Sequence, residues 1–220
     1  MNSGLAFLHT ARSNVELFAR LAERLDPSVP TRHALIENVL ADAVGTGAVT
    51  DAMRDETEAA IRGLAQDGAT IVVCTCSTIG GVAEATRVDG VRVMRIDRPM
   101  AEQAVASGRR IIVAATLPST LLPTTSLIRQ VARDANRAIE MVEWLCEDAW
   151  PHFERGDVSG YADAIARSVA NIARPLDIVV LAQASMAPAE QPLAASGILA
   201  LSSPELGVRA ALTACREQSA

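Results

Sequence analysis

One cysteine of the sequence, Cys76, has the surroundings that activate a thiol. It follows the apolar run 71–75 and precedes the segment Ser77-Thr78-Ile79-Gly80-Gly81, so it falls where a strand is expected to end and a helix to begin. The free N–H groups of a helix N-terminus carry partial positive charge, which lowers the pKa of a thiol and attracts carboxylates. The plain alternative is a cysteine that only packs at the strand end. We predict that Cys76 is catalytic in a site for a small anion.

The remaining candidate ligands do not favour a metal or a resident cofactor. Cys74 lies inside the same apolar run and is expected to be a small buried side chain. Cys146, Cys215 and the three histidines lack the spacing that would complete a metal site with Cys74 and Cys76. All twenty basic residues are arginine, so no lysine can anchor pyridoxal phosphate. We therefore expect no metal and no cofactor.

The histidines and one arginine carry weaker expectations. His9 ends the first expected strand and could line a site, and His33 lies near the end of the second. An ordinary hydrogen-bonded histidine is the favoured interpretation of both. Arg12 follows the first strand and could meet a carboxylate.

Composition limits the class of protein. Half of the 220 residues are apolar and only 3% are aromatic, which is typical of Val/Ile/Leu strands covered by Ala-rich helices. The net charge is −6 with no basic, aromatic-rich patch, so we expect no nucleic-acid partner. No apolar stretch approaches the roughly 18 residues of a membrane helix, and no secretion signal is evident at the start. We expect a cytoplasmic protein with free cysteines and no membrane partner.

Strands and helices are expected to alternate along the chain, which implies right-handed βαβ units and mostly parallel sheets. A loop at Gly45 and Gly47 interrupts the pattern early. The expected strands are 4–9, 31–35, 69–75, 91–96, 110–115, 139–142, 177–182 and 198–201. The expected helices are 13–25, 36–43, 53–64, one starting after Cys76, 99–107, 121–135, 143–154, 157–173 and 204–215.

Two stretches of the sequence look like copies of one plan. The run 5–10 resembles 111–116, and the run 71–76 resembles 178–183. Thr10 and Cys76 are 66 positions apart, and Thr116 and Gln183 are 67 apart. We predict an α/β fold of two pseudo-twofold-related lobes, each a mostly parallel four-stranded sheet flanked by helices. The first lobe would comprise 1–98 with the C-terminal helix 203–220, and the second 99–202.

Small polar residues occupy the expected carboxyl ends of the strands in both copies. Ligands of open parallel sheets bind at these ends, so the side chains are expected to converge on one cleft between the lobes. The structural alternative is that each of these residues only caps the helix that follows it. The residues are Thr10, Cys76 and Thr78 in the first copy and Thr116, Thr120, Gln183 and Ser185 in the second.

These motifs resemble the aspartate/glutamate racemase superfamily over essentially the whole chain. The triplet Cys76-Ser77-Thr78 matches the family's Cys-Asn/Ser-Thr, and the turn Thr116 to Thr120 matches its threonine-containing turn. The resemblance implies substrate contacts from Thr10 and Asn14, and from the polar residues of both turns. It also implies cofactor-independent chemistry at a carbon next to a carboxylate, as in amino-acid and hydantoin racemases, maleate isomerases and arylmalonate decarboxylases. Homodimers are common in that family.

The sequence departs from the family where a second catalytic cysteine is expected. The near-repeat aligns Gln183 with Cys76, and glutamine does not titrate. Ser185 is close by but has no evident activating base. The leading hypothesis is an isomerase of the racemase or cis–trans type that acts on a small acid or amino acid with Cys76 as its single thiol. The alternatives are a decarboxylase of a small dicarboxylate and a catalytically degenerate protein that binds small acids.

Overall fold

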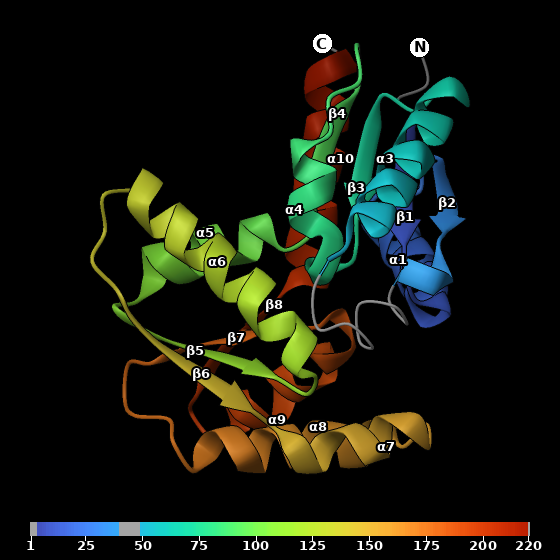
Figure 1. The fold of residues 1–220 in the computed structure, drawn as a ribbon. Helices are drawn as coiled ribbons and strands as arrows, with labels where there is room; N and C mark the ends of the chain where they lie inside the picture. Colours follow the sequence, from blue (N-terminus) through green and yellow to red (C-terminus); the bar gives the residue numbers. More distant parts are fainter. Residues whose placement is uncertain (1–3, 40–48, 220) are drawn as a thin grey trace. The chain divides into compact units, whose positions relative to one another are not determined.

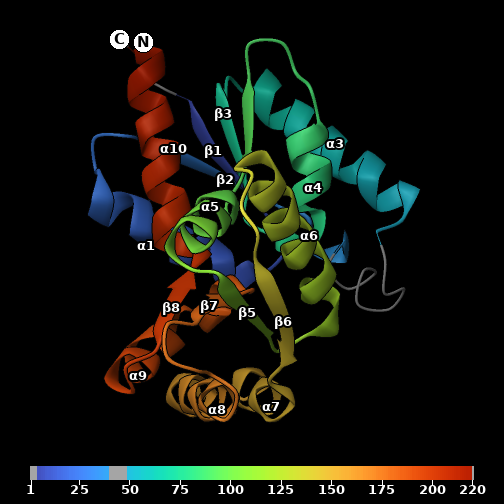
Figure 2. The same cartoon turned by 90° about the vertical axis from the view of Figure 1, so that its left-hand side faces the viewer.

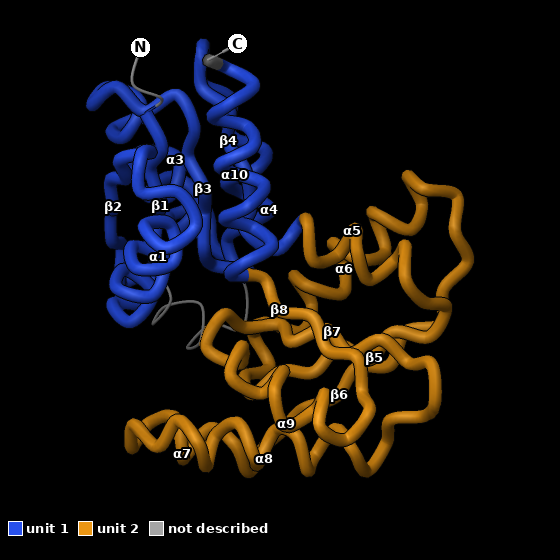
Figure 3. The backbone as a smooth tube through the Cα atoms, turned by 180° about the vertical axis from the view of Figure 1, so that it is seen from behind, with its two compact units in different colours: residues 1–98, 204–220 blue, residues 99–203 orange. Residues whose placement is uncertain are grey.

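The computed structural model describes residues 4–39 and 49–219, which form two compact units (Figure 3). Unit 1 comprises 1–98 and 204–220, and unit 2 comprises 99–203. The helix expected over 36–43 and the glycine loop after it fall mostly in 40–48, outside the described residues.

Unit 1 is built on a parallel four-stranded sheet with the strand order β2-β1-β3-β4 (Figure 1). Its strands are β1 (Leu5–His9), β2 (Thr31–Leu35), β3 (Ile71–Cys74) and β4 (Arg92–Arg95). The two central strands are buried along their whole length. This burial explains why their sequences are continuous apolar runs rather than alternating patterns.

Helices cover both faces of this sheet (Figure 2). The helices α3 (Asp51–Gln66) and α4 (Ser77–Ala85) pack through Ile61 and Ile79 on the face that carries Ala6, Leu8, Val72 and Cys74. The opposite face carries α1 (Arg12–Leu25), whose Phe18 ring stacks on Phe7 of β1. The C-terminal helix α10 (Ser203–Ser219) joins α1 through an Arg24–Glu205 ion pair of 3.0 Å.

Unit 2 repeats the same sheet plan with the order β6-β5-β7-β8, again all parallel. Its strands are β5 (Arg110–Ala115), β6 (Glu140–Leu145), β7 (Ile178–Leu181) and β8 (Leu199–Ser202). Two four-stranded parallel sheets flanked by helices confirm the predicted fold class. Leu8 lies opposite Cys74 in unit 1, and Ala114 lies opposite Leu181 in unit 2. Because these separations equal those of the near-repeat, Cys76 and Gln183 occupy equivalent positions, each two residues beyond its strand.

The helices of unit 2 are also divided between two faces of the sheet (Figure 1). One side carries α5 (Arg98–Ser107) and α6 (Pro118–Asp134). The other carries α8 (Val158–Ala170), which packs Tyr161, Ile165 and Val169 against β5 and β7. Shorter segments complete this side: η1 (Glu147–Ala149), α7 (Trp150–Glu154), η2 (Ala184–Ala189) and α9 (Glu190–Ala195).

Two expectations about secondary structure were wrong. The helix expected over 143–154 begins too early, because β6 pairs with β5 as far as Ala115 and Leu145. The helical part is limited to η1 and α7. No helix was expected over 184–195, where Pro188 and Pro192 stand. The structure accommodates Pro188 in the 3₁₀ turn η2 and Pro192 in the first turn of α9, where a missing N–H costs little.

Candidate active site

Cys76 lies at the N-terminus of α4, as the sequence predicted. It is the N-cap residue, with extended backbone angles (φ −105°, ψ 118°) and 8% of its surface exposed. The Cys76 side chain makes no capping hydrogen bond, so the first-turn N–H groups keep their capacity to bind an anion. Cys74 is fully buried, and its thiol donates to the Cys76 carbonyl at 3.6 Å. Burial raises the pKa of Cys74 far above its ordinary value, so Cys74 stays a neutral thiol.

A buried ion pair holds the first turn of α4. Arg95 at the end of β4 donates from Nε and Nη2 to the two carboxylate oxygens of Asp97, at 2.6 and 2.9 Å. The Ser77 hydroxyl donates to the same carboxylate. Burial alone would raise the pKa of Asp97, but the charge and hydrogen bonds of Arg95 and the bond from Ser77 outweigh it and lower the pKa. The residue that follows Cys76 is therefore tied to a fixed carboxylate.

Gly80 gives this ion pair its space. A Cβ at this position would lie 3.0 Å from Arg95 Nε, closer than ordinary van der Waals contact. A glycine near a helix start allows a ligand or a neighbouring group to approach the backbone closely. In the structure the guanidinium of Arg95 lies against it. Arg95 and Asp97 were not expected as site residues, since Arg87 and Asp89 have the same spacing and are exposed.

Thr78 differs from Ser77 in having no hydrogen-bond partner. Its hydroxyl oxygen is buried in the first turn of α4 and is unpaired within the described part of the chain. The N-cap position is taken by Cys76, and Ser77 and Thr78 are the first two residues of the helix. Thr10 is 3% exposed in the turn after β1, at the same sheet end as Cys76, and Asn14 is half-buried in the first turn of α1. Arg12 instead pairs with Glu37 at the surface, at 3.0 Å.

Two histidines form a hydrogen-bonded chain that ends next to Cys76. His9 Nδ1 is 2.9 Å from Thr75 Oγ1, and His9 Nε2 is 2.9 Å from His33 Nδ1. Thr75 also donates its hydroxyl proton to the Leu8 carbonyl at 3.2 Å, so it must accept from His9. His9 Nε2 then accepts from His33 Nδ1–H, and His33 Nε2 accepts from Thr31 at 3.1 Å. Both rings are thus neutral Nδ1–H tautomers.

The lowered pKa values of both rings agree with their assignment as neutral imidazoles. Burial, with a smaller contribution from the charge of His33, lowers the pKa of His9 to about 3. Burial also lowers the pKa of His33. His9 is fully buried and stacks on His33. The expectation of hydrogen-bonded histidines is confirmed, although the sequence did not indicate that the two bond to each other.

In unit 2 the Gln183 side chain is fixed by its oxygen. Gln183 Oε1 accepts from the Thr116 N–H at 2.7 Å, from the Thr116 hydroxyl at 3.0 Å and from the Leu117 N–H at 3.3 Å. Three donors to one oxygen determine the orientation of the amide. The Nε2 group has no hydrogen-bond partner among residues 4–39 and 49–219, so two N–H donors at the end of β7 remain available.

Tyr161 links the remaining polar residues of this cluster. Its hydroxyl is 3.0 Å from Thr116 Oγ1 and 3.2 Å from Ser185 Oγ. Since Thr116 donates to Gln183, Thr116 accepts from Tyr161, and Tyr161 accepts from Ser185. Burial raises the pKa of Tyr161, which keeps the phenol protonated. The sequence gave a signal that could have found this residue: a lone tyrosine on a core-facing helix position requires a buried hydrogen-bond partner.

Thr120 has a local structural contact. Its hydroxyl donates to the Leu117 carbonyl at 2.8 Å and closes the first turn of α6.

Within the described ranges no group of three or more His, Cys, Asp or Glu residues is arranged to hold a metal ion, and none of the helices has the length and apolar character of a membrane span.

Solved structures with the same fold include racemases and a decarboxylase. Glutamate racemase from Thermus thermophilus, in complex with β-chloro-D-alanine, superposes with a TM-score of 0.73 at 17% identity, over 99% of this chain and 82% of that one. Aspartate racemase from Picrophilus torridus gives 0.71 at 14% identity, over 96% and 94%. A variant of arylmalonate decarboxylase gives 0.57 at 16%, over 97% and 93%.

The chain therefore shares its fold with these glutamate and aspartate racemases and with arylmalonate decarboxylase. No protein-family model matches the sequence, and no curated protein matches it in sequence. Shared architecture at such low identity leaves the chemistry to be argued from this chain's own residues.

Proposed function

We propose that this protein is a cofactor-independent enzyme that acts at the carbon next to the carboxylate of a small acid or amino acid, with Cys76 as its single catalytic thiol. The observation that carries the proposal is the position of Cys76 at the uncapped N-terminus of α4, with Ser77 tied to the Arg95–Asp97 pair. A thiol placed there is close to N–H groups that stabilise negative charge.

The first turn of α4 supplies the substrate-binding groups. We assign the substrate carboxylate to its free N–H groups and to the unpaired Thr78 hydroxyl. In the reaction the Cys76 thiolate takes the hydrogen of the adjacent carbon as a proton. The electron pair of the broken C–H bond then delocalises into the carboxylate as an enediolate. Returning the proton from the thiol restores the C–H bond and the thiolate.

Gln183 has a different task from Cys76 although it occupies the equivalent position. Its amide cannot exchange a proton with carbon, and its oxygen is already committed to Thr116 and Leu117. We propose that the free Nε2–H groups donate to an oxygen of the substrate, strengthening as negative charge develops there. Tyr161 and Thr116 keep the amide in the orientation that this role requires.

A single thiol has a stereochemical consequence for α-hydrogen exchange. With one proton carrier, exchange of the α-hydrogen is faster than inversion of configuration.

The second candidate reaction is decarboxylation of a small dicarboxylate, which needs only one proton donor. It is favoured by Gln183 in place of a second thiol and by the likeness to arylmalonate decarboxylase. In this candidate reaction the C–CO₂ electron pair stays on carbon as carbon dioxide leaves, and the Cys76 thiol protonates that carbon.

The test is a ¹H NMR screen in D₂O of D- and L-amino acids, small hydroxy acids and 2-substituted malonates. We expect α-deuteration or carbon dioxide loss for at least one compound, abolished in Cys76→Ala. The matched control is Cys215→Ala, which removes another buried thiol, on α10, and should keep full activity. Turnover that survives Cys76→Ala would refute the role of this thiol. Ligand-induced melting shifts without turnover would instead favour a binding protein.

A further inference from the structure

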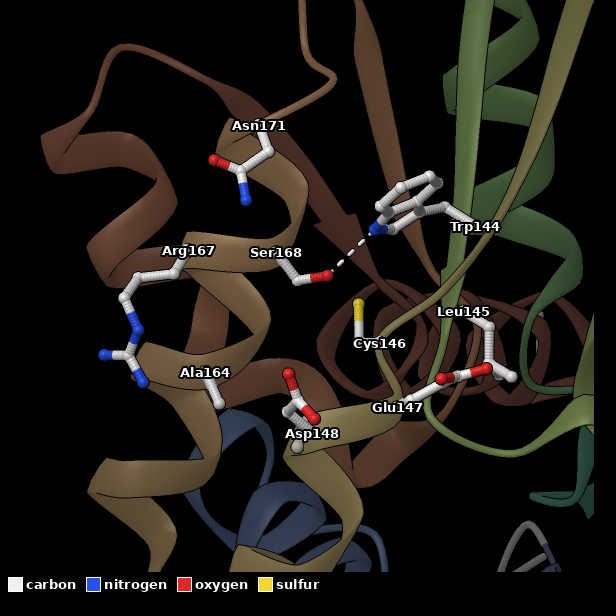
Figure 4. A pocket seen from close by; sticks show the side chains of 10 residues that line it. Trp144, Leu145, Cys146, Glu147, Asp148, Ala164, Arg167, Ser168 and Asn171 are labelled. Atoms are coloured by element: carbon white, nitrogen blue, oxygen red, sulfur yellow. Dashed lines mark hydrogen bonds between the residues drawn. The ribbon is translucent and has the colours of Figure 1, made fainter.

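Unit 2 contains a pocket of about 720 Å³ between the end of β6, the 3₁₀ turn η1 and helix α8 (Figure 4). Every residue that lines it lies between Trp144 and Asn171. Its volume is within the range of small-molecule sites. None of the residues assigned above to Cys76 chemistry lines it, so its function is a separate question.

The pocket has charged and polar side chains of opposite kinds on its two walls. Arg167 and Asn171 project from α8, and Glu147 and Asp148 from η1. In the described part of the chain none of these four side chains has a hydrogen-bond or ion-pair partner. Figure 4 shows the Asn171 amide and the Asp148 carboxylate near opposite ends, with Ser168 between them. One wall thus offers donors to an anion, and the other offers acceptors to a cation.

The centre of the pocket is neutral and its polar atoms are already paired. Trp144 Nε1 donates to Ser168 Oγ at 2.9 Å, and Ser168 is hydrogen-bonded to Cys146. Cys146 is 1% exposed, and burial raises the pKa of its thiol. The Trp144 ring and the side chains of Leu145 and Ala164 provide apolar lining. A bound ligand would therefore have its polar groups next to charged side chains and its hydrocarbon part against an apolar surface.

We propose that this pocket binds a neutral α-amino acid with an aliphatic side chain. Its carboxylate would lie against Arg167 and Asn171, its ammonium group against Asp148 and Glu147, and its side chain against Trp144 and Leu145. One arginine and two carboxylates give the lining a net charge of −1, which disfavours guests with two negative charges. The inference does not depend on the reaction proposed for Cys76.

Three probes of the same shape test zwitterion recognition, measured by isothermal titration calorimetry and by tryptophan fluorescence, to which Trp144 and Trp150 both contribute. They are L-leucine, isoamylamine, which lacks the carboxylate, and 4-methylpentanoate, which lacks the ammonium group. We expect L-leucine to bind at least about 10-fold more tightly than either analogue, since each loses a charge-assisted hydrogen bond. Equal affinities for the three, or no saturable binding of L-leucine in the millimolar range, would overturn the proposal.

Single substitutions test which end of the ligand, the carboxylate or the ammonium group, contacts which side of the pocket. Arg167→Gln should weaken L-leucine about 10-fold and leave isoamylamine unchanged, and Asp148→Asn should weaken L-leucine and leave 4-methylpentanoate unchanged. Both side chains are exposed, so neither substitution should affect folding. The control is Arg133→Gln on α6, an exposed arginine outside the pocket, which should alter none of the affinities. An unchanged affinity for L-leucine in Arg167→Gln would contradict the assignment.

Discussion

The substitution Asp97→Asn tests whether the buried ion pair stabilises the start of α4. Asp97 and Arg95 expose only 1% and 6% of their side chains, and the carboxylate accepts from Arg95 twice and from Ser77 once. Asparagine keeps the shape but leaves the Arg95 charge buried without a counter-charge. Breaking such a pair costs about 3–5 kcal/mol. In a chain of this size that corresponds to a fall in melting temperature of roughly 6–20 °C.

The pH dependence of stability gives a second readout of the same pair. The pKa of Asp97 is lowered in the folded protein, so its contribution is complete above the ordinary aspartate pKa of 3.8. The contribution is lost as the pH falls through the lower folded value. The wild-type protein should therefore lose more stability than Asp97→Asn on acidification below about pH 4.

Melting temperatures measured by calorimetry or circular dichroism are compared with those of a matched surface pair. Arg92 and Glu217 also form an ion pair in unit 1, but their side chains are 52% and 62% exposed. Glu217→Gln should cost less than about 1 kcal/mol. The apolar double variant Arg95→Met/Asp97→Leu should recover much of the loss, since it removes both charges. Equal effects of Asp97→Asn and Glu217→Gln would refute the reasoning.

Three further perturbations follow from the hydrogen-bond networks. Below pH 6.5 the unfolded chain binds more protons than the folded one, because the pKa of His9 is lowered to about 3 in the folded protein. As the pH decreases, stability should fall by up to about 1.4 kcal/mol per pH unit for this group, and urea denaturation of His9→Gln should show a smaller fall. Tyr161→Phe removes the hydroxyl between Thr116 and Ser185 and should cost about 1 kcal/mol by the same assay, whereas an unchanged midpoint would exclude a structural role for that hydroxyl. Gln183→Leu leaves the N–H groups at the start of α6 without their acceptor and should cost about 1–3 kcal/mol, so a stabilised variant would show that the oxygen is not needed there.

The central strands could be predicted from the sequence because buried parallel strands are continuous apolar runs. The runs 71–75 and 178–182 identify β3 and β7, and the near-repeat aligns Cys76 with Gln183, as the strand register confirms. The edge strand β6 was harder, since Glu140–Leu145 mixes charged and aromatic residues that fit a helix equally well.

The networks around the candidate site could be predicted only in part. Ser77 and Thr78 have similar side chains and adjacent positions, yet one is bonded to Asp97 and the other is unpaired. That difference depends on where β4 places Asp97 relative to α4, which no local pattern encodes. The bond between His9 and His33 likewise depends on the pairing of β1 with β2.

The stereochemical course of α-hydrogen exchange tests the single-thiol proposal most directly. A substrate found in the D₂O screen is followed as one pure enantiomer, with deuterium uptake measured by NMR and configuration by chiral chromatography. The wild-type protein should exchange the α-hydrogen at least about 10-fold faster than it inverts the centre, because Cys76 exchanges protons on one face. Gln183→Cys should bring inversion closer to exchange. Inversion that keeps pace with exchange in the wild-type protein would contradict the proposal that one thiol does the chemistry.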